Sequence, residues 1–357
     1  MKNYLYLLIT VLAAFTVILI IFHFGDILNK KNNGFDRNYF HNSYSNQHEI
    51  DLPDTLYEIV GANRSSIYIT TAVPGEILSV GRNLEKKVNR IKIPFFARFY
   101  DSLKLSSLAI KIDSPYIYLF AENKPAIVKA SFDSTLFEIR ILPPGPFTRE
   151  AMIGGDRFIL RKLEPRLTDQ IFVRYDFIQG ISIKEEDISE IHGDGGIVSD
   201  GRLHFDTETK KLYYIYFYKN MVLSFDTSLN VSNRFSSIDT TRSFKIRTGL
   251  VKNGGSVAYT NITPANIINR TNYVEKGLLF NMSALRADNE TDKFFSSHSI
   301  LDIIDLKNGR YLGSISLPLF HDRKVSQFII SNNRLICLYA NSILTYDLNP
   351  DIDRRDQ

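Results

Sequence analysis

The sequence has one cysteine, no tryptophan and none of the short motifs that identify common catalytic sites. The lone Cys337 excludes an intramolecular disulfide and a thiolate metal cluster. Its apolar surroundings, residues 335–339, predict a small buried side chain. A G-x-S-x-G elbow, a Walker loop, a CxxC pair and closely spaced histidines are all missing. The sequence therefore assigns no catalytic residue, no metal ligand and no cofactor, and it favours a protein that is not an enzyme.

Charge of one sign is also missing. The 43 basic residues are offset by 39 acidic ones, and both kinds are spread along the chain. This distribution excludes the basic patch expected of a nucleic-acid-binding protein. Hydrophobic residues make up 44% of the chain, which is enough to form a sizeable core.

One long apolar run lies at the N-terminus. Residues 4–24 are interrupted only by Thr10, Thr16 and His23, and their number matches the roughly 20 residues that cross a bilayer as a helix. No small-residue cleavage site follows Phe24, which favours a transmembrane helix or signal anchor over a cleaved signal peptide. Residues 25–47 are rich in Asn, Ser and Tyr without periodicity, and we expect a flexible stalk there.

A short strand followed by Asp and a turn recurs along the rest of the chain. Each copy alternates like a half-buried strand, and Asp suits the turn because its side chain can bond the backbone two residues further on. A degenerate copy has Gly81 in place of Asp. The copies lie at 77–85, 127–135, 171–177, 222–230, 300–309 and 343–351.

Two further strands accompany most copies. A strand rich in Tyr, Phe and Ile precedes the copy, and another strand, often ending in proline, follows it, as at 89–94 and 313–318. The resulting antiparallel units of about 42–52 residues have the length of a four-stranded propeller blade. The predicted fold is therefore all-β, a propeller over residues 48–350 followed by a charged tail at 351–357.

The two ends of this region complement each other. The last copy lacks its following strand, whereas residues 49–53 match the strand-then-proline pattern without a blade before them. We expect the N-terminal strand to complete the last blade and close the ring. The copies predict six blades, but the 79 residues that separate Asp226 from Asp305 leave room for a long insertion or a seventh blade near 257–272.

With this repeat of a strand, an Asp and a turn, residues 48–350 resemble the six-bladed TolB-like or NHL-like propellers of exported bacterial proteins. The missing tryptophan argues against WD-repeat and quinoprotein propellers. The resemblance implies the architecture and leaves the function open, because propellers include binding proteins and enzymes.

The basic residues on either side of the apolar run bear on the orientation of the chain in the membrane. Lys2 lies before the apolar run, and Lys30, Lys31 and Arg37 follow it, so the positive-inside count slightly favours a cytoplasmic body. Because propellers with this kind of N-terminal flank are usually exported, we nevertheless expect a periplasmic body tethered by one N-terminal helix.

Candidate ligand-binding residues lie in loops that are expected to join one blade to the next. Three loops share a loose pattern in which proline and phenylalanine are followed by arginine. Convergence of these arginines at the channel mouth would suit a carboxylate or phosphate. The alternative is that they bridge neighbouring blades through backbone carbonyls and surface acids. The candidates are Arg98, Arg149, Arg242, His321 and Arg323.

These features predict a membrane-tethered binding or scaffold module with a protein, peptide or small anionic ligand on its loop face. A propeller hydrolase or lyase with a divalent metal in the channel is one alternative. An accessory subunit of a periplasmic redox enzyme is another.

Overall fold

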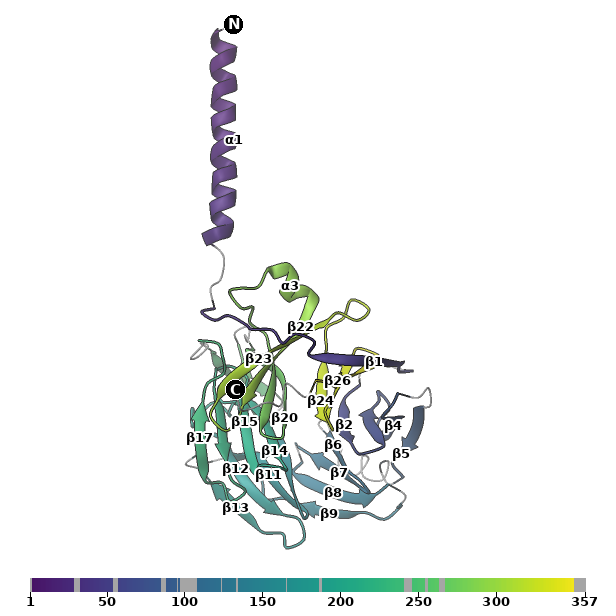
Figure 1. Ribbon diagram of the computed structural model, residues 1–357. Coiled ribbons are helices and arrows are strands. Elements are labelled where there is room, and N and C mark those ends of the chain that lie inside the picture. Colours follow the sequence, from purple (N-terminus) through teal and green to yellow (C-terminus); the bar gives the residue numbers. More distant parts are fainter. Residues whose placement is uncertain are drawn as a thin grey trace.

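The computed structural model describes most of the chain. The described residues are 2–28, 33–53, 57–84, 88–94, 96, 108–122, 124–132, 134–164, 166–185, 188–240, 246–253, 256–262 and 267–349. They form two helices, α1 (Lys2–Leu28) and α3 (Asp292–Ser297), and a ring of β-sheets (Figure 1).

The ring is a propeller of six blades, each a sheet of four antiparallel strands. Blade 1 consists of β2 (Ile59–Ala62), β3 (Ser66–Thr70), β4 (Glu76–Gly81) and β5 (Val88–Lys92). Blade 2 consists of β6 (Leu108–Asp113), β7 (Tyr116–Ala121), β8 (Ala126–Ser131) and β9 (Glu138–Ile141). Blade 3 consists of β10 (Phe147–Gly154), β11 (Arg157–Glu164), β12 (Asp169–Asp176) and β13 (Ser182–Glu185). Blade 4 consists of β14 (Gly201–Asp206), β15 (Lys211–Tyr216), β16 (Val222–Phe225) and β17 (Val231–Phe235). Blade 5 consists of β20 (Asn269–Glu275), β21 (Leu278–Ser283), β22 (His298–Asp305) and β23 (Arg310–Pro318). Blade 6 consists of β24 (Gln327–Ser331), β25 (Arg334–Tyr339) and β26 (Ser342–Leu348), joined by β1 (Tyr44–Asp51). The predicted all-β propeller is confirmed.

The core consists of six apolar clusters, one between each pair of neighbouring blades. Strand β21 shows how the sequence builds them, because successive side chains of a strand point to opposite faces. Leu278 and Phe280 pack toward blade 6, whereas Leu279 packs toward blade 4. The middle strands are therefore apolar on both faces, like the buried strands of a parallel sheet. Cys337 lies in one of these clusters and is fully buried, as expected.

The repeated aspartate acts as predicted at several blades. It lies at the end of the third strand, and its carboxylate accepts hydrogen bonds from the backbone of the following turn. Oδ1 of Asp176 accepts from the backbone N–H of Ile178 at 3.0 Å. Asp226 accepts from Ser228 and Asp305 accepts from Lys307 in the same way. The repeat therefore marks the turn between the third and fourth strands of a blade.

The ring is closed by its first strand. Strand β1 pairs antiparallel with β26, with Glu49 opposite Leu344 and Asp51 opposite Ser342. The last blade is thus assembled from both ends of the propeller, as the sequence predicted.

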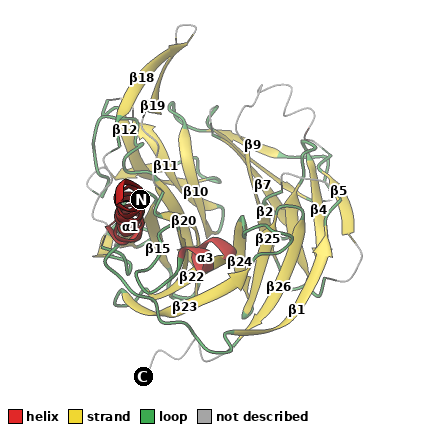
Figure 2. Ribbon diagram, turned by 90° about the horizontal axis from the view of Figure 1, so that it is seen from above, coloured by secondary structure: helices red, strands yellow, loops and turns green. Residues whose placement is uncertain are grey.

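The long gap in the repeat contains an insertion. Strands β18 (Thr248–Asn253) and β19 (Ser256–Asn261) form a separate two-stranded hairpin between blades 4 and 5. This hairpin projects outward from the rim of the ring (Figure 2). Its residues do not add a seventh blade, so the alternative of seven blades is wrong.

No helix in the described part of the chain is both long enough and apolar enough to span a membrane.

Residues 33–43 differ from the flexible stalk that we expected over 25–47. This segment, here called the strap, lies against blade 5 and leads directly into β1 (Figure 1). The backbone N–H of Asn33 donates to the carboxylate of Asp288, and its side-chain amide donates to the carbonyl of Arg286. The polar composition that suggested a stalk instead supplies hydrogen bonds to the loop between β21 and β22.

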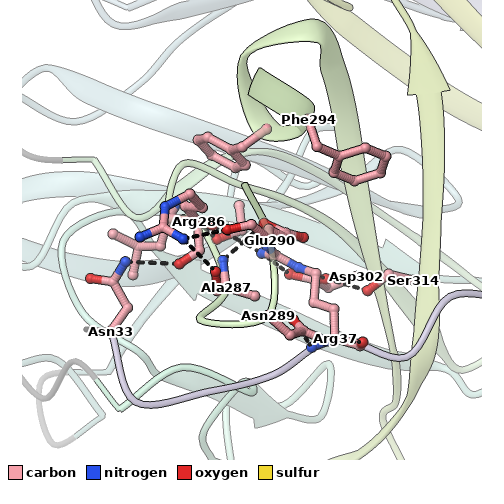
Figure 3. Close-up of polar contacts among 12 residues, drawn as sticks. Asn33, Arg37, Arg286, Ala287, Asn289, Glu290, Phe294, Asp302 and Ser314 are labelled. Carbon is pink, nitrogen blue, oxygen red and sulfur yellow. Dashed lines mark hydrogen bonds and ion pairs between the residues drawn. The ribbon is translucent and has the colours of Figure 1, made fainter. Parts of the chain in front are cut away.

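Arg37 holds the strap in place (Figure 3). Its side chain is fully buried, and its guanidinium donates to both oxygens of Asp302, at 2.7 and 3.0 Å, and to Glu290 at 3.0 Å. Asp302 also accepts from the hydroxyl of Ser314 at 2.6 Å. A cation and two anions are thus removed from water together, and each is hydrogen-bonded.

We expect Arg37→Ala to lower the free energy of unfolding by about 3–5 kcal/mol, because Glu290 and Asp302 would be left buried without their cation. Urea unfolding of the purified protein would measure the loss.

Arg323→Ala is the control. Arg323 is exposed, and its side chain makes no hydrogen bond or ion pair within the part of the chain that the structure describes, so its loss is expected to change the free energy of unfolding by no more than about 0.5 kcal/mol. Equal, small effects of the two substitutions would contradict the clamping role of Arg37.

Candidate functional site

The candidate site is a cavity in the central channel. It is lined by the innermost strands of the six blades, which surround the centre of the ring in Figure 2. Its volume is about 570 Å³. Charged or polar residues of all six blades line it. The polar residues that line it are Glu58, Lys111, Glu122, Thr148, Arg149, Glu150, Arg202, His204, Asn272, Tyr273, Gln327 and Ser331.

Of the predicted residues, Arg149 lies in this cavity. It belongs to β10 of blade 3, and its Nε donates to the carbonyl of Gly201 at 2.6 Å, in blade 4. Its Nη2 lies 2.8 Å from Oδ2 of Asp200. Arg149 therefore joins neighbouring blades through a backbone carbonyl and an acid, which is the alternative role considered for the arginine loops.

His321 and Arg323 are not brought together with Arg149. His321 and Arg323 lie on an exposed turn before β24, and neither lines the cavity. In this turn the ring of His321 stacks on Phe320 at 4.1 Å. Arg98 and Arg242 lie outside the described residues. Among the described residues, the predicted arginines Arg149 and Arg323 do not converge.

Arg202 is not among the residues predicted from the sequence. It lines the cavity, and its guanidinium, unlike that of Arg149, is not paired with another described residue. It follows Gly201 at the start of β14 and is partly buried. Burial lowers the pKa of its guanidinium, and the nearby charge of Arg149 lowers it further. Within the part of the chain that the structure describes, the side chain of Arg202 has no hydrogen-bond partner. The alternation of Arg202 and His204 in a strand pattern was the one available signal, because it places both side chains on the same face.

His204 and Asn272 continue this wall of the cavity into blade 5. Nε2 of His204 lies 2.7 Å from Oδ1 of Asn272. Burial lowers the pKa of His204 to about 3, and Arg202 and Lys111 contribute in the same direction, so the imidazole is neutral at neutral pH. With the Asn272 oxygen as acceptor, Nε2 is the donor. The buried Nδ2 of Asn272 has no hydrogen-bond partner among the described residues.

The walls formed by blades 2 and 3 carry charges of both signs. Lys111 of β6 lies 3.4 Å from Glu150 of β10, whose side chain is only 8% exposed. Burial raises the pKa of Glu150, and Lys111 opposes this shift. Across the described residues, His, Cys, Asp and Glu side chains do not gather in threes as metal ligands would. The cavity therefore offers donors and charges of both signs, which are groups that bind and orient a polar ligand.

No protein-family model matches the sequence. No curated protein is similar to it at a significant level.

Solved structures show likeness in fold. A member of the DUF4221 family from Bacteroides vulgatus is 12% identical with a TM-score of 0.53, and the match covers 89% of this chain and 99% of that one. BamB from Moraxella catarrhalis is 12% identical with a TM-score of 0.39, covering 82% and 81% of the two chains. The gluconolactonase XC5397 from Xanthomonas campestris is 12% identical with a TM-score of 0.46, covering 89% and 97%. At such low identity the first match shows the propeller fold alone.

The partly buried His204 predicts a pH dependence of stability. Its pKa is near 3 in the folded protein against an ordinary value of 6.5, so the unfolded chain binds a proton at higher pH than the folded one. This contribution to stability is complete above about pH 6.5 and is lost as the pH falls toward 3. We expect His204 to account for a loss of about 2 kcal/mol between pH 7 and pH 5.

Urea unfolding of wild type and His204→Gln at several pH values would measure this contribution. The variant should lose less stability on acidification, whatever its stability at pH 7. His321→Gln is the control, because His321 is exposed, and it should follow the wild-type profile. Parallel profiles for wild type and His204→Gln would show that His204 is not held neutral.

Proposed function

We propose that this propeller is a binding module whose central channel holds a small polar ligand with an anionic group, a carboxylate or a phosphate. The observation that carries the proposal is Arg202, a guanidinium that lines the cavity and has no hydrogen-bond partner among the described residues. An arginine offers a planar fork of donors that matches both kinds of anion.

The energetics of Arg202 favour a ligand at this position. A partly buried cation loses hydration without gaining a fixed partner, and an anion placed on the fork would supply charge-assisted hydrogen bonds. The unpaired Nδ2 of Asn272 offers a further donor on the same wall. Lys111 and Glu150, on the walls formed by blades 2 and 3, would favour a ligand that carries both donor and acceptor groups.

Arg149 supports this interpretation by contrast. It lines the same cavity, but its guanidinium is already paired with Asp200 and Gly201. The two arginines therefore have separate roles, one in joining blades and the other in ligand binding.

Arg202→Gln and Arg149→Gln form a matched pair for testing this function. The melting temperature of Arg202→Gln should stay close to that of wild type, because no hydrogen bond is lost. Arg149→Gln should melt several degrees lower, because it loses its contacts to blade 4.

Binding should show the same contrast. Small mono- and dicarboxylates, amino acids and sugar phosphates would be screened by thermal shift against the wild type, and the Kd of each stabilising compound measured by calorimetry. Arg202→Gln should raise that Kd by about 10–100-fold, the effect of losing a charge-assisted hydrogen bond. A large loss of stability in Arg202→Gln with an unchanged Kd would overturn the proposal.

We further propose that the propeller is held at a membrane, with its body outside the cytoplasm. The apolar run of residues 4–24 supports an anchor. In α1 the side chains from Ile9 to Ile20 are exposed and do not pack on the propeller. The orientation rests on the resemblance to exported propellers.

A reporter enzyme that is active only outside the cytoplasm would test this location when fused after Gln357. We expect activity, and we expect the fusion to sediment with membranes. Deletion of residues 2–28 should release the protein from the membrane fraction. Reporter activity confined to the cytoplasm would contradict the orientation.

A further inference from the structure

A second cavity lies outside the central channel, beside α3. Its volume is about 380 Å³, and it is enclosed by the start of β20, the end of β21, the region from α3 to β22, and the loop before β24. The face of the ring that carries α3 is here called the α3 face, and Figure 1 shows α1 on this side. The polar residues that line the cavity are Arg270, Ser283, Ser296, His298, Ser299 and Lys324.

The charged residues of this cavity are cations. Among the described residues that line it, none is an aspartate or glutamate. Burial lowers the pKa of Lys324, and the nearby charge of Arg270 lowers it further, with Glu290 acting in the opposite direction. Two cations close enough to repel each other favour an anion between them.

Arg270 and Lys324 differ in how they are held. Nζ of Lys324 donates to the carbonyl of Phe295 at 2.6 Å and lies 4.8 Å from the centre of the Phe295 ring. The ammonium is thus fixed at the cavity wall by the end of α3. Arg270 is exposed and has no hydrogen bond or ion pair within the part of the chain that the structure describes. One cation is therefore positioned in advance, and the other is available to close over a ligand.

Two buried hydroxyl groups complete the site. Oγ of Ser299 accepts from the backbone N–H of Val325 at 3.0 Å, and Oγ of Ser283 accepts from that of Leu285 at 3.1 Å. A hydroxyl also carries one hydrogen to donate. Neither hydroxyl donates it to any described residue. Both can therefore donate to a ligand oxygen.

We propose that this cavity is a binding site for a phosphate group, held by Arg270 and Lys324 with hydrogen bonds from Ser283 and Ser299. A phosphate has several acceptor oxygens and a charge that two cations can neutralise. The inference does not depend on a ligand in the central channel, because the two cavities share no lining residue.

The phosphate could come from a soluble phosphate ester or from a lipid headgroup. The strap begins on the α3 face, where Asn33 contacts Arg286 and Asp288. If residues 4–24 anchor the chain, only residues 25–32 separate the membrane from this face, so headgroups would lie near the cavity.

The test uses the full-length protein in a neutral detergent. Calorimetric titrations would use three probes, namely inorganic phosphate, glycerol 3-phosphate and a short-chain phosphatidate. We expect Arg270→Gln and Lys324→Gln each to raise the Kd of the bound probe about tenfold or more. Ser299→Ala should raise it by a smaller factor. Arg270 is exposed, so its substitution leaves the fold intact even if that of Lys324 does not.

Two variants serve as controls. Arg323→Gln removes a neighbouring exposed cation on the same loop, and Arg157→Gln removes an exposed cation of blade 3 that lines neither cavity; both should keep the wild-type Kd within about twofold. Tighter binding of phosphatidate than of glycerol 3-phosphate, lost in Arg270→Gln, would assign the site to a lipid headgroup. Equal binding of the two would assign it to a soluble phosphate ester. The proposal is overturned if no probe binds at millimolar concentration, or if the controls weaken binding as much as Arg270→Gln does.

Discussion

The structure depends on the pairing of β1 with β26, which joins the two ends of the propeller. Each of the six apolar clusters lies between two neighbouring blades, and the cluster between blades 6 and 1 forms only when the ring closes. Residues Ile50 and Leu52, in and just after β1, belong to the cluster between blades 6 and 1. A closed ring also leaves no broad open face at its first and last blades. The strap precedes β1 without a break, so ring closure and the buried pairs of Arg37 belong to one continuous segment, residues 33–51.

Closure also creates the channel. The inner strands come from parts of the chain that are distant in sequence, and the ring brings Lys111, Arg202 and Asn272 to one cavity. The polar groups there are unequally satisfied. Arg149 is used to join blades, whereas Arg202 and Nδ2 of Asn272 keep donors without partners. Because buried donors are normally paired, the unpaired ones in this cavity support the proposal that a ligand binds there.

The α3 face gathers the features that bear on function. The loop that contains α3 contacts the strap through Asp288 and Glu290, and its far end forms a wall of the Arg270 and Lys324 cavity. The side-chain amide of Asn269, at the start of β20, donates to the carbonyl of Tyr216. Tyr216 pairs with Gly201, the residue before Arg202, so Arg202 also lies toward the α3 face. The cavity of Arg270 and Lys324 is therefore on the side of the ring from which the N-terminal segment departs, and Arg202 lies toward the same end of the channel.

The sequence by itself determined the architecture, because its signals are local. The aspartates at 176, 226 and 305 mark turns whose hydrogen bonds span two residues, and the unpaired strand at 49–53 indicated ring closure. The apolar run around Cys337 likewise predicted burial. The inner strands carry no shared motif, since each faces a channel whose lining differs from blade to blade. Only the tertiary structure therefore showed that Arg202 lines the cavity, that His321 and Arg323 do not, and that Arg37 is buried. The partners of Arg37, Glu290 and Asp302, lie more than 250 residues away along the chain. Long-range contacts of this kind depend on how the blades pack, which no local pattern of residues encodes.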